Sequence, residues 1–269
     1  MVYQPKFYYC RIPTQLEGKI IRNETLILSN TARPGFKLHP LFIDTNGHEL
    51  EYVLLSAYDG CAYNTSASAY NLTDSTNVNY AEDKLSSIAN AKPISGLDKE
   101  LTAANAEKLA TNRGEGWHIT NMAAESANQM LEIIEFGTLN GQVALEAGIV
   151  DVPNTVRTNC SSITGSTASL GNASGAASST ISEANGNRTT YNTSGRRAIS
   201  YRGMENPWGN IWRFIGGVNV TGDGTQHGGH IYICSNYDYN IFEITNDYRE
   251  IPIDLPNESG YTSAFGYDE

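Results

Sequence analysis

The alternation of apolar and polar positions predicts strands at the start of the chain. Short apolar clusters are separated by polar turns, and these clusters lie at 7–10, 19–21 and 26–28. This spacing is typical of short strands or of an extended arm, because alternate residues of a strand face opposite sides. We therefore expect residues 1–35 to form an N-terminal β arm.

A hairpin signal follows the arm. The apolar runs 41–43 and 51–58 flank Asn46-Gly47. Asn-Gly between two such runs favours a tight hairpin, since both central residues of a type I′ turn need positive φ. The same turn begins at Asp44 and has part of the pattern of a calcium loop, but the third oxygen ligand and the distal Glu are missing. The sequence therefore favours a hairpin over a calcium site.

One segment in the middle of the chain has the period of a helix. Its apolar positions recur at i, i+3, i+4 and i+7, and they are Ala127, Met130, Leu131 and Ile134. This stripe predicts an amphipathic helix over 122–136, with Thr120 or Asn121 accepting its first free amides. Weaker patterns predict helical turns at 103–109 and at 142–147. Between the arm and these helices, 61–100 should be irregular, with a short helix near 81–89.

The last part of the chain has a low-complexity stretch and then β-rich sequence. Residues 160–187 carry a single charge, Glu183, among Ser, Thr, Gly, Ala and Asn. Such a stretch buries too little apolar area to form its own core, so 160–195 should be a surface excursion or a disordered linker. Strand patterns follow, and they lie at 197–203, 206–220 and 231–234, with a glycine-rich hairpin at 221–230.

Composition narrows the possible partners. The formal charge of −11 argues against nucleic acid, whose phosphates the surface would repel. No apolar run approaches the roughly 18 residues of a membrane span, and the start lacks the pattern of a signal peptide. We therefore expect a soluble protein made inside a cell. The 26 Asn, 25 Gly and 16 Tyr residues replace charged ones, which favours a β-rich protein or an adhesive binding surface.

Residues that could support catalysis or metal binding are scattered. The cysteines, Cys10, Cys61, Cys160 and Cys234, are far apart and form no Cys-x-x-Cys pair, so we expect free thiols. His227 and His230 could offer two nitrogens to a metal, but from a glycine-rich turn. Glu132 and Glu135 suggest a carboxylate pair, although solvated helix carboxylates are the simpler interpretation. We expect no catalytic residue, no metal and no cofactor.

Two tryptophans mark the most specific motif of the chain. Residues 201–212 read Tyr-Arg-Gly-Met-Glu-Asn-Pro-Trp-Gly-Asn-Ile-Trp, with Trp208 and Trp212 on either side of Gly209-Asn210. Burial of an indole contributes about 2–3 kcal/mol, so both should fix a strand in the centre of the domain. The motif resembles the Gly-Asn-x-Trp element of the C-type-lectin-like fold, in the branch of formylglycine-generating enzymes and variable phage receptor-binding proteins. It also resembles segments of bacteriophage tail-fibre and other virion proteins.

The resemblance extends over roughly 36–234, with wide gaps. Residues 52–59 resemble the early strand of that fold, and 116–120 with the following helix resemble its Trp-led entry to a core helix. The calcium-dependent sugar motifs of lectins are absent, because Glu205-Asn206-Pro207 has another order, and the cysteines of the formylglycine enzymes have no counterpart. The resemblance thus implies a scaffold only.

The resemblance implies the following organisation. An α+β, C-type-lectin-like domain spans 36–269, with one main amphipathic helix, short twisted antiparallel strands and long loops, behind the arm of 1–35. Its core includes Trp117, Trp208, Asn210 and Trp212. Receptor contacts come from a paratope-like run late in the chain, made of Tyr237, Asp238, Tyr239 and Asn240. Those tyrosines packed inward in a hairpin are the alternative.

We therefore expect a non-catalytic virion protein, assembled in the host cytoplasm and released by lysis. As a tail-fibre or tail-tip protein it would bind a host glycan or protein, attach to other virion proteins through its arm, and form a homo-oligomer, for which a trimer is one option. The alternative is a structural virion component, such as a head fibre, collar or capsid decoration protein, that contacts only virion proteins. A cell-wall or glycan hydrolase using Glu132 or His230 is the third hypothesis.

Overall fold

The computed structural model describes two compact units built from several segments each. Unit 1 comprises Met1–Gln4, Leu54–Ile119 and Phe136–Phe214, and unit 2 comprises Pro5–Val53, Thr120–Glu135 and Ile215–Glu269. The expected boundary between residues 35 and 36 coincides with no division between these units. The residues that the structure describes are 1–18, 20–44, 46–74, 77–95, 101–151, 161–178, 195–224, 228–234, 243–255 and 265–266.

The chain is α+β, with few helices and several small antiparallel sheets, as the sequence predicts. The helical segments are η1 (Pro40–Phe42), α1 (Ala103–Thr111), α2 (Met122–Phe136), α3 (Gly141–Ala144) and η2 (Ala168–Leu170). The strands of the first half are β1 (Val2–Pro5), β2 (Tyr8–Glu17), β3 (Ile20–Ser29), β4 (Lys37–Leu38), β5 (Tyr52–Leu55), β6 (Cys61–Asn64), β7 (Ala69–Tyr70) and β8 (Lys84–Ser86). Those of the second half are β9 (Gly175–Ala176), β10 (Ile199–Tyr201), β11 (Met204–Glu205), β12 (Val218–Gly222), β13 (Gly229–Ile233), β14 (Arg249–Leu255) and β15 (Phe265–Gly266).

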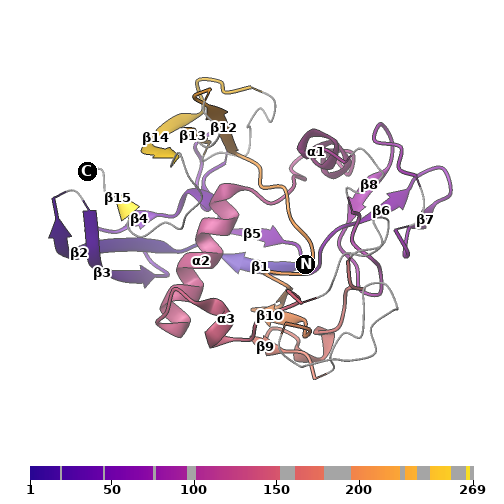
Figure 1. The fold of residues 1–269 in the computed structure, drawn as a ribbon, viewed down its shortest axis with the longest axis horizontal. Helices are drawn as coiled ribbons and strands as arrows, with labels where there is room; N and C mark the ends of the chain where they lie inside the picture. Colours follow the sequence, from indigo (N-terminus) through magenta and orange to yellow (C-terminus); the bar gives the residue numbers. More distant parts are fainter. Residues whose placement is uncertain are drawn as a thin grey trace. The chain divides into compact units, whose positions relative to one another are not determined.

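The N-terminal strands of unit 2 form a long ribbon. β2 and β3 run side by side as a long antiparallel ribbon (Figure 1), and the four-stranded sheet has the order β15-β3-β2-β4. The two outer strands are short, since β4 pairs only with Tyr8 and Tyr9, and β15 pairs only with Ile20 and Ile21. The prediction of strands in the first 30 residues is confirmed.

The expected hairpin over 41–58 is only partly present. The turn exists, because the side chain of Asp44 accepts hydrogen bonds from the amides of Asn46 (2.9 Å) and His48 (2.7 Å). Beyond it, however, Ile43 and Glu49 form a single antiparallel bridge, and residues 40–42 form η1. β5 pairs with β1 instead. The proline at the start of η1 has no amide for a ladder, which limits the length of a hairpin here.

The central helix of the sequence is present with the predicted bounds. α2 begins after Asn121, whose side-chain oxygen accepts from the Ala124 amide at 2.9 Å, as a helix cap does. The buried face is centred on Ala127 and Leu131, whereas Ile134 is 41% exposed. The apolar stripe therefore has the right period but faces the core through its small residues.

Unit 1 contains a three-stranded sheet that the sequence did not predict. β6 pairs with β7 and with β8 in antiparallel register, and α1 packs beside β8 (Figure 1). The short helix expected near 81–89 is therefore wrong, because this segment supplies β8. The core between this sheet and α1 is the cluster of Ala62, Ile94 and Leu109, against which Leu85 packs. Alternation is hard to see in a three-residue strand, and pairing with β6 fixes its conformation.

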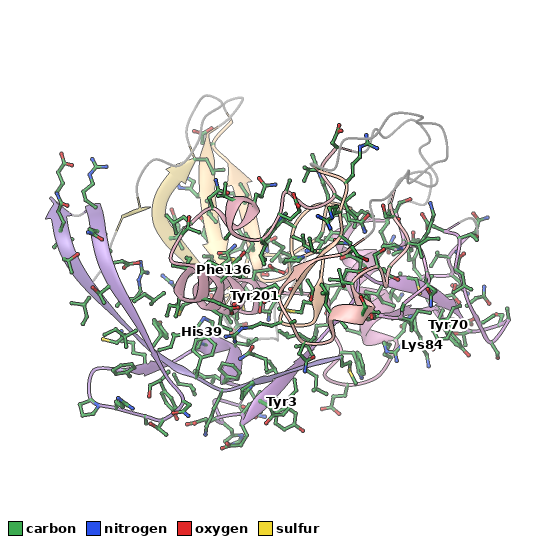
Figure 2. The ribbon with its side chains drawn as sticks, turned by 90° about the horizontal axis from the view of Figure 1, so that it is seen from below. Tyr3, His39, Tyr70, Lys84, Phe136 and Tyr201 are labelled. Carbon is green, nitrogen blue, oxygen red and sulfur yellow. The ribbon has the colours of Figure 1, made fainter. Side chains whose placement is uncertain are left out.

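A second small sheet of unit 1 includes β9, which lies within the described part of the low-complexity stretch. Its order is β11-β10-β9, and the residues of β10 are all buried. The rings of Phe136 and Tyr201 lie next to each other, with centroids 6.0 Å apart (Figure 2). This strand therefore lies in the core of unit 1.

Another three-stranded sheet, β12-β13-β14, belongs to unit 2. Val218 to Gly222 pair with Ile233 to Gly229 in antiparallel register, which confirms the predicted strands on either side of the glycine-rich turn. β14 adds to the other edge of β13. The segment 235–242, between β13 and β14, lies outside the described residues.

Candidate functional site

The two-tryptophan motif forms a tight turn and not a strand. β11 ends at Glu205, and no strand is assigned from there to Phe214 within this described stretch. Asn206, Gly209 and Asn210 have φ values of +51°, +78° and +62°. Such values reverse the chain, and a strand does not accommodate them. The expectation of a central strand over 206–220 is therefore wrong for its first half, while β12 occupies the second half.

Gly209 places this turn directly against another backbone segment. A Cβ atom at this position would lie 2.7 Å from the carbonyl oxygen of Ile149. The amide of Asn210 donates to that same oxygen at 2.8 Å. Glycine is needed here for both its positive φ and its lack of a side chain.

Hydrogen bonds from Asn210, Asp59 and Arg213 fix the conformation of the turn. The side-chain oxygen of Asn210 accepts from the Ser162 amide at 2.8 Å, and its nitrogen donates to Oδ2 of Asp59 at 3.1 Å. The other oxygen of Asp59 accepts from Nε of Arg213 at 2.8 Å. Arg213 also donates to the carbonyl oxygens of Pro207, at 2.9 Å, and of Asn206. Both ends of the turn are thereby tied to the loop that carries Asp59.

Glu205, just before the turn, fixes a neighbouring loop. Its carboxylate is 4% exposed and accepts three hydrogen bonds of 2.8 Å, from the Gly165 amide and from the amide and hydroxyl of Thr167. Its own amide donates to the Ala57 carbonyl at 2.8 Å. A buried carboxylate surrounded by donors is well compensated for its loss of water.

Part of the low-complexity stretch is buried and not a surface excursion. Ser161, Ser162, Thr164 and Thr167 are each less than 5% exposed. The hydroxyl of Thr164 donates to the Ile88 carbonyl at 2.7 Å, and that of Ser161 donates to the Pro93 carbonyl at 3.1 Å. The expectation for 160–195 is therefore wrong for these residues, because small polar side chains here satisfy loop backbone inside unit 1. Residues 152–160 and 179–194 lie outside the described residues.

The three tryptophans occupy different environments. Trp208 is half-buried against Gly148, where an added Cβ would lie 2.9 Å from the indole. Trp117 is 40% exposed and lies under the guanidinium of Arg113, 4.5 Å from the ring centroid. Trp212 is 100% exposed. Trp212 is therefore no core residue, and Trp117 is at most a partly covered one, contrary to expectation.

The exposure of Trp212 follows from the conformation of the turn. Asn210 and Arg213 both direct their side chains inward to Asp59, and Trp212 between them is left on the outer side. Phe214, two residues further, is 41% exposed. We call Trp212 and Phe214, with the turn that carries them, the Trp212 turn. It presents aromatic surface on a base fixed by hydrogen bonds.

The other predicted site residues fall into two groups. Tyr237, Asp238, Tyr239 and Asn240 lie outside the described residues, and so do His227 and Cys160. Among the described ones, His230 pairs with Glu250 at 2.9 Å across β13 and β14. Burial and the charge of Glu135 raise the pKa of Glu132. Within the described ranges, no group of three or more His, Cys, Asp or Glu side chains is placed to hold a metal ion.

The described cysteines are free thiols. Cys61 and Cys234 are buried and Cys10 is half-buried. Burial raises the pKa of the Cys61 thiol to about 11, which keeps it protonated and unreactive at neutral pH.

Sequence reasoning named Asn210 as a structural residue but missed Asp59 and Arg213, the two charged residues that hold the Trp212 turn with it. Asp59 is 151 positions from Asn210, and although the sequence predicts a strand over 52–59, nothing in it pairs Asp59 with Asn210 or Arg213. The available signal was Asn-Pro followed by Gly-Asn, a combination typical of turns and not of strands.

Comparison of the chain with known proteins adds no relative. No protein-family model, no curated protein and no solved structure matches it. In the part of the chain that the structure describes, no helix combines the length and the apolar character that crossing a bilayer requires.

Proposed function

We propose that this chain is a non-catalytic bacteriophage virion protein, a tail-fibre or tail-tip protein that binds a molecule on the host cell surface. The observation that carries the proposal is the Trp212 turn. A fully exposed indole on a base fixed by Asp59, Asn210 and Arg213 gains hydrophobic free energy when a partner covers it, and the fixed base lowers the ordering cost of that contact. Exposed tryptophan side chains held in one conformation are common in binding surfaces.

The scaffold that we propose is C-type-lectin-like. Its support is the α+β arrangement with one long helix, small antiparallel sheets and long loops. In this proposal Trp208 supports the turn from within, through its contact with Gly148. Tyr237, Asp238, Tyr239 and Asn240 remain the proposed receptor contacts.

The N-terminal arm is the proposed attachment to other virion proteins, and the surface through which copies of the chain assemble. Cys10 pairs with Ile27 and Ile12 with Thr25, so these four side chains share one face of the ribbon. That face is uncharged, and Ile12 and Ile27 are 46% and 38% exposed. Because the arm contacts need no receptor, this feature alone also fits the alternative, a structural virion component.

Two measurements test the proposal. Antibodies raised against the purified chain should label virions recovered from the organism that carries the gene, and the position of the label separates a tail tip from a head or collar. Labelling of the head or collar would favour the structural alternative, and absence of label from all virions would refute both.

Substitution of the proposed receptor contacts is the second measurement. Tyr237→Ala combined with Tyr239→Ala should abolish adsorption of the purified protein to host cells and leave the melting temperature nearly unchanged. Loss of folding would mean instead that these rings belong to the core. Tyr70→Ala, which removes a 46% exposed tyrosine of unit 1, is the matched control and should adsorb like the unchanged protein.

A further inference from the structure

The β2–β3 ribbon of unit 2 has few neighbouring strands. Each of its strands has ten residues, but β4 pairs only with Tyr8 and Tyr9 of β2, and β15 pairs only with Ile20 and Ile21 of β3. In the part of the chain that the structure describes, no other backbone segment hydrogen-bonds to β3. Alternate residues of β3 beyond Ile21 therefore present N–H and C=O groups at an open edge. A ribbon of two strands is marginally stable by itself, so a further strand at this edge would stabilise it.

The two edges of the ribbon differ in how they are protected against pairing. β2 contains Pro13, which has no amide to donate, and a bulge at Thr14, which has no partner in β3. Proline and bulges are features by which edge strands avoid pairing with other chains. β3 has neither over residues 23–29, where every residue has a partner in β2 and the one charged side chain, Glu24, is bound to Arg11 at 2.9 Å. The edge that suits pairing is therefore that of β3.

The charge of the ribbon favours a second copy of the same chain as the partner. The chain carries a net charge of −11, so two copies repel each other over most of their surface. Residues 8–29 carry three Lys or Arg and two Glu. Ion pairs neutralise four of these charges within the ribbon, and they are Arg11–Glu24 at 2.8 Å and Arg22–Glu17 at 2.6 Å. Two ribbons can therefore approach each other without the repulsion that keeps the rest of two copies apart.

We propose that β3 pairs with β3 of a second copy in antiparallel register, so that two arms form one sheet of the order β2-β3-β3-β2 across a two-fold axis. This inference rests on the proposed role of the arm in assembly, and it names the contact through which the arm joins copies of the chain. The axis passes through Leu26, the midpoint of the regular stretch 23–29, so that the whole stretch is paired. Thr25 then lies opposite Ile27 of the second copy, and both belong to the uncharged face of the ribbon.

The proposed contact predicts a dimer and not a trimer. Each arm has one unprotected edge, and an antiparallel pair of identical strands uses the edges of both copies. Pro13 and the bulge at Thr14 then protect the outer edges of the four-stranded sheet, which stops further copies from adding. The difference between the two edges of the ribbon thus limits assembly to a closed pair.

Sedimentation equilibrium of the full chain measures the proposed assembly. The unchanged protein should have twice the mass of one chain, which is 29.3 kDa. Thr25→Lys should raise the Kd of the dimer by about 10-fold, which is about 1.4 kcal/mol, because two Thr25–Ile27 pairs are lost and two positive charges approach each other. Thr14→Lys makes the same chemical change at an exposed position of β2 and is the matched control, so it should leave the Kd unchanged. Circular dichroism should show that both variants fold like the unchanged protein.

Oxidative cross-linking locates the contact, with Cys160 replaced by Ser in every protein used. A cysteine in place of Leu26 would lie opposite the same position of the second copy, with Cβ atoms about 5 Å apart, within reach of a disulfide. Cys10 of β2 would lie at least three strand spacings, about 14 Å, from Cys10 of the second copy and out of reach. Leu26→Cys combined with Cys10→Ser should therefore form a disulfide-linked dimer, whereas the chain that keeps Cys10 and Leu26 should not. If Leu26→Cys does not fold, a mixture of Thr25→Cys and Ile27→Cys chains, both with Cys10→Ser, supplies the opposed pair.

Other outcomes would contradict the inference in distinct ways. A monomer at all concentrations, or an equal Kd for Thr25→Lys and Thr14→Lys, would refute pairing at the edge of β3, and a trimer would refute the two-fold axis. A disulfide between two copies through Cys10 would show that the uncharged faces of the ribbons stack instead. A monomer that still adsorbs to host cells would refute this inference alone. A dimer that is absent from all virions and adsorbs to no host cell would refute the proposed function and leave the dimer contact intact.

Discussion

Removal of one charge beneath the Trp212 turn should destabilise unit 1. The side chain of Asp59 is 8% exposed, and each of its oxygens accepts one bond, from Nδ2 of Asn210 at 3.1 Å and from Nε of Arg213 at 2.8 Å. Asp59→Asn keeps the shape but replaces one acceptor with a donor. Whichever way the new amide turns, an N–H group faces another N–H group.

The cost follows from the bonds lost. A hydrogen bond to a charged group contributes about 1.5–3 kcal/mol, and a donor left buried without a partner adds to that loss. Since Arg213 keeps some contact with water, at 27% side-chain exposure, we take about 1.5–2 kcal/mol for the lost bond, and the unpaired donor adds the remainder. The expected loss of unfolding free energy is about 2–3 kcal/mol.

Tryptophan fluorescence during urea unfolding reports the stability of unit 1, where the loss is expected. The only tryptophans of the chain are Trp117, Trp208 and Trp212, and all three belong to unit 1. With a urea dependence of about 1–3 kcal/mol/M, the midpoint should fall by roughly 1 M. Glu115→Gln, the same chemical change at an exposed position of unit 1, should leave the midpoint unchanged. If Asp59→Asn unfolds at the same urea concentration as the unchanged protein, the hydrogen bonds of Asp59 do not hold the turn.

Two further predictions concern a buried histidine and a crowded glycine. His39 packs between Phe7 and Phe42, its Nδ1 accepts from the Leu41 amide at 3.2 Å, and burial lowers its pKa to about 4. Between pH 6.5 and pH 4, His39 is protonated in the unfolded chain but neutral in the folded chain. The free energy of unfolding should therefore fall by about 3 kcal/mol as the pH falls from 6.5 to 4. Hydrogen exchange of α2 peptides should show this loss of stability as the pH falls. The His39→Asn variant should show a smaller pH dependence. If its pH dependence is the same as that of the unchanged protein, His39 is not the source. Gly209→Ala should lower the free energy of unfolding by at least about 3 kcal/mol, because its Cβ would lie 2.7 Å from the Ile149 carbonyl oxygen. Gly137 has a similar φ but open space around it, so Gly137→Ala should lower the free energy of unfolding by only about 1 kcal/mol. Equal urea midpoints for the two variants would contradict the steric argument.

Elements that depend on local pattern could be predicted from the sequence. The bounds of α2 follow from a 3.6-residue period and from the cap at Asn121, both of which are fixed by neighbouring residues. The β2–β3 ribbon and the β12–β13 pair likewise join segments that are adjacent in the chain. The α+β class follows from these elements.

The candidate site could not be predicted in this way, because its conformation depends on bonds between distant residues. The positive φ of Asn210 is stabilised by Asp59 and Ser162, which are 151 and 48 positions away. A large apolar side chain such as Trp212 suggests a core by its size alone, and only the tertiary structure decides whether anything covers it. The sequence by itself determined the local elements and the presence of an unusual tryptophan motif. The tertiary structure decided that this motif turns its polar side chains inward and leaves its second indole in solvent, because the inward groups find buried partners from other parts of the chain and the indole does not.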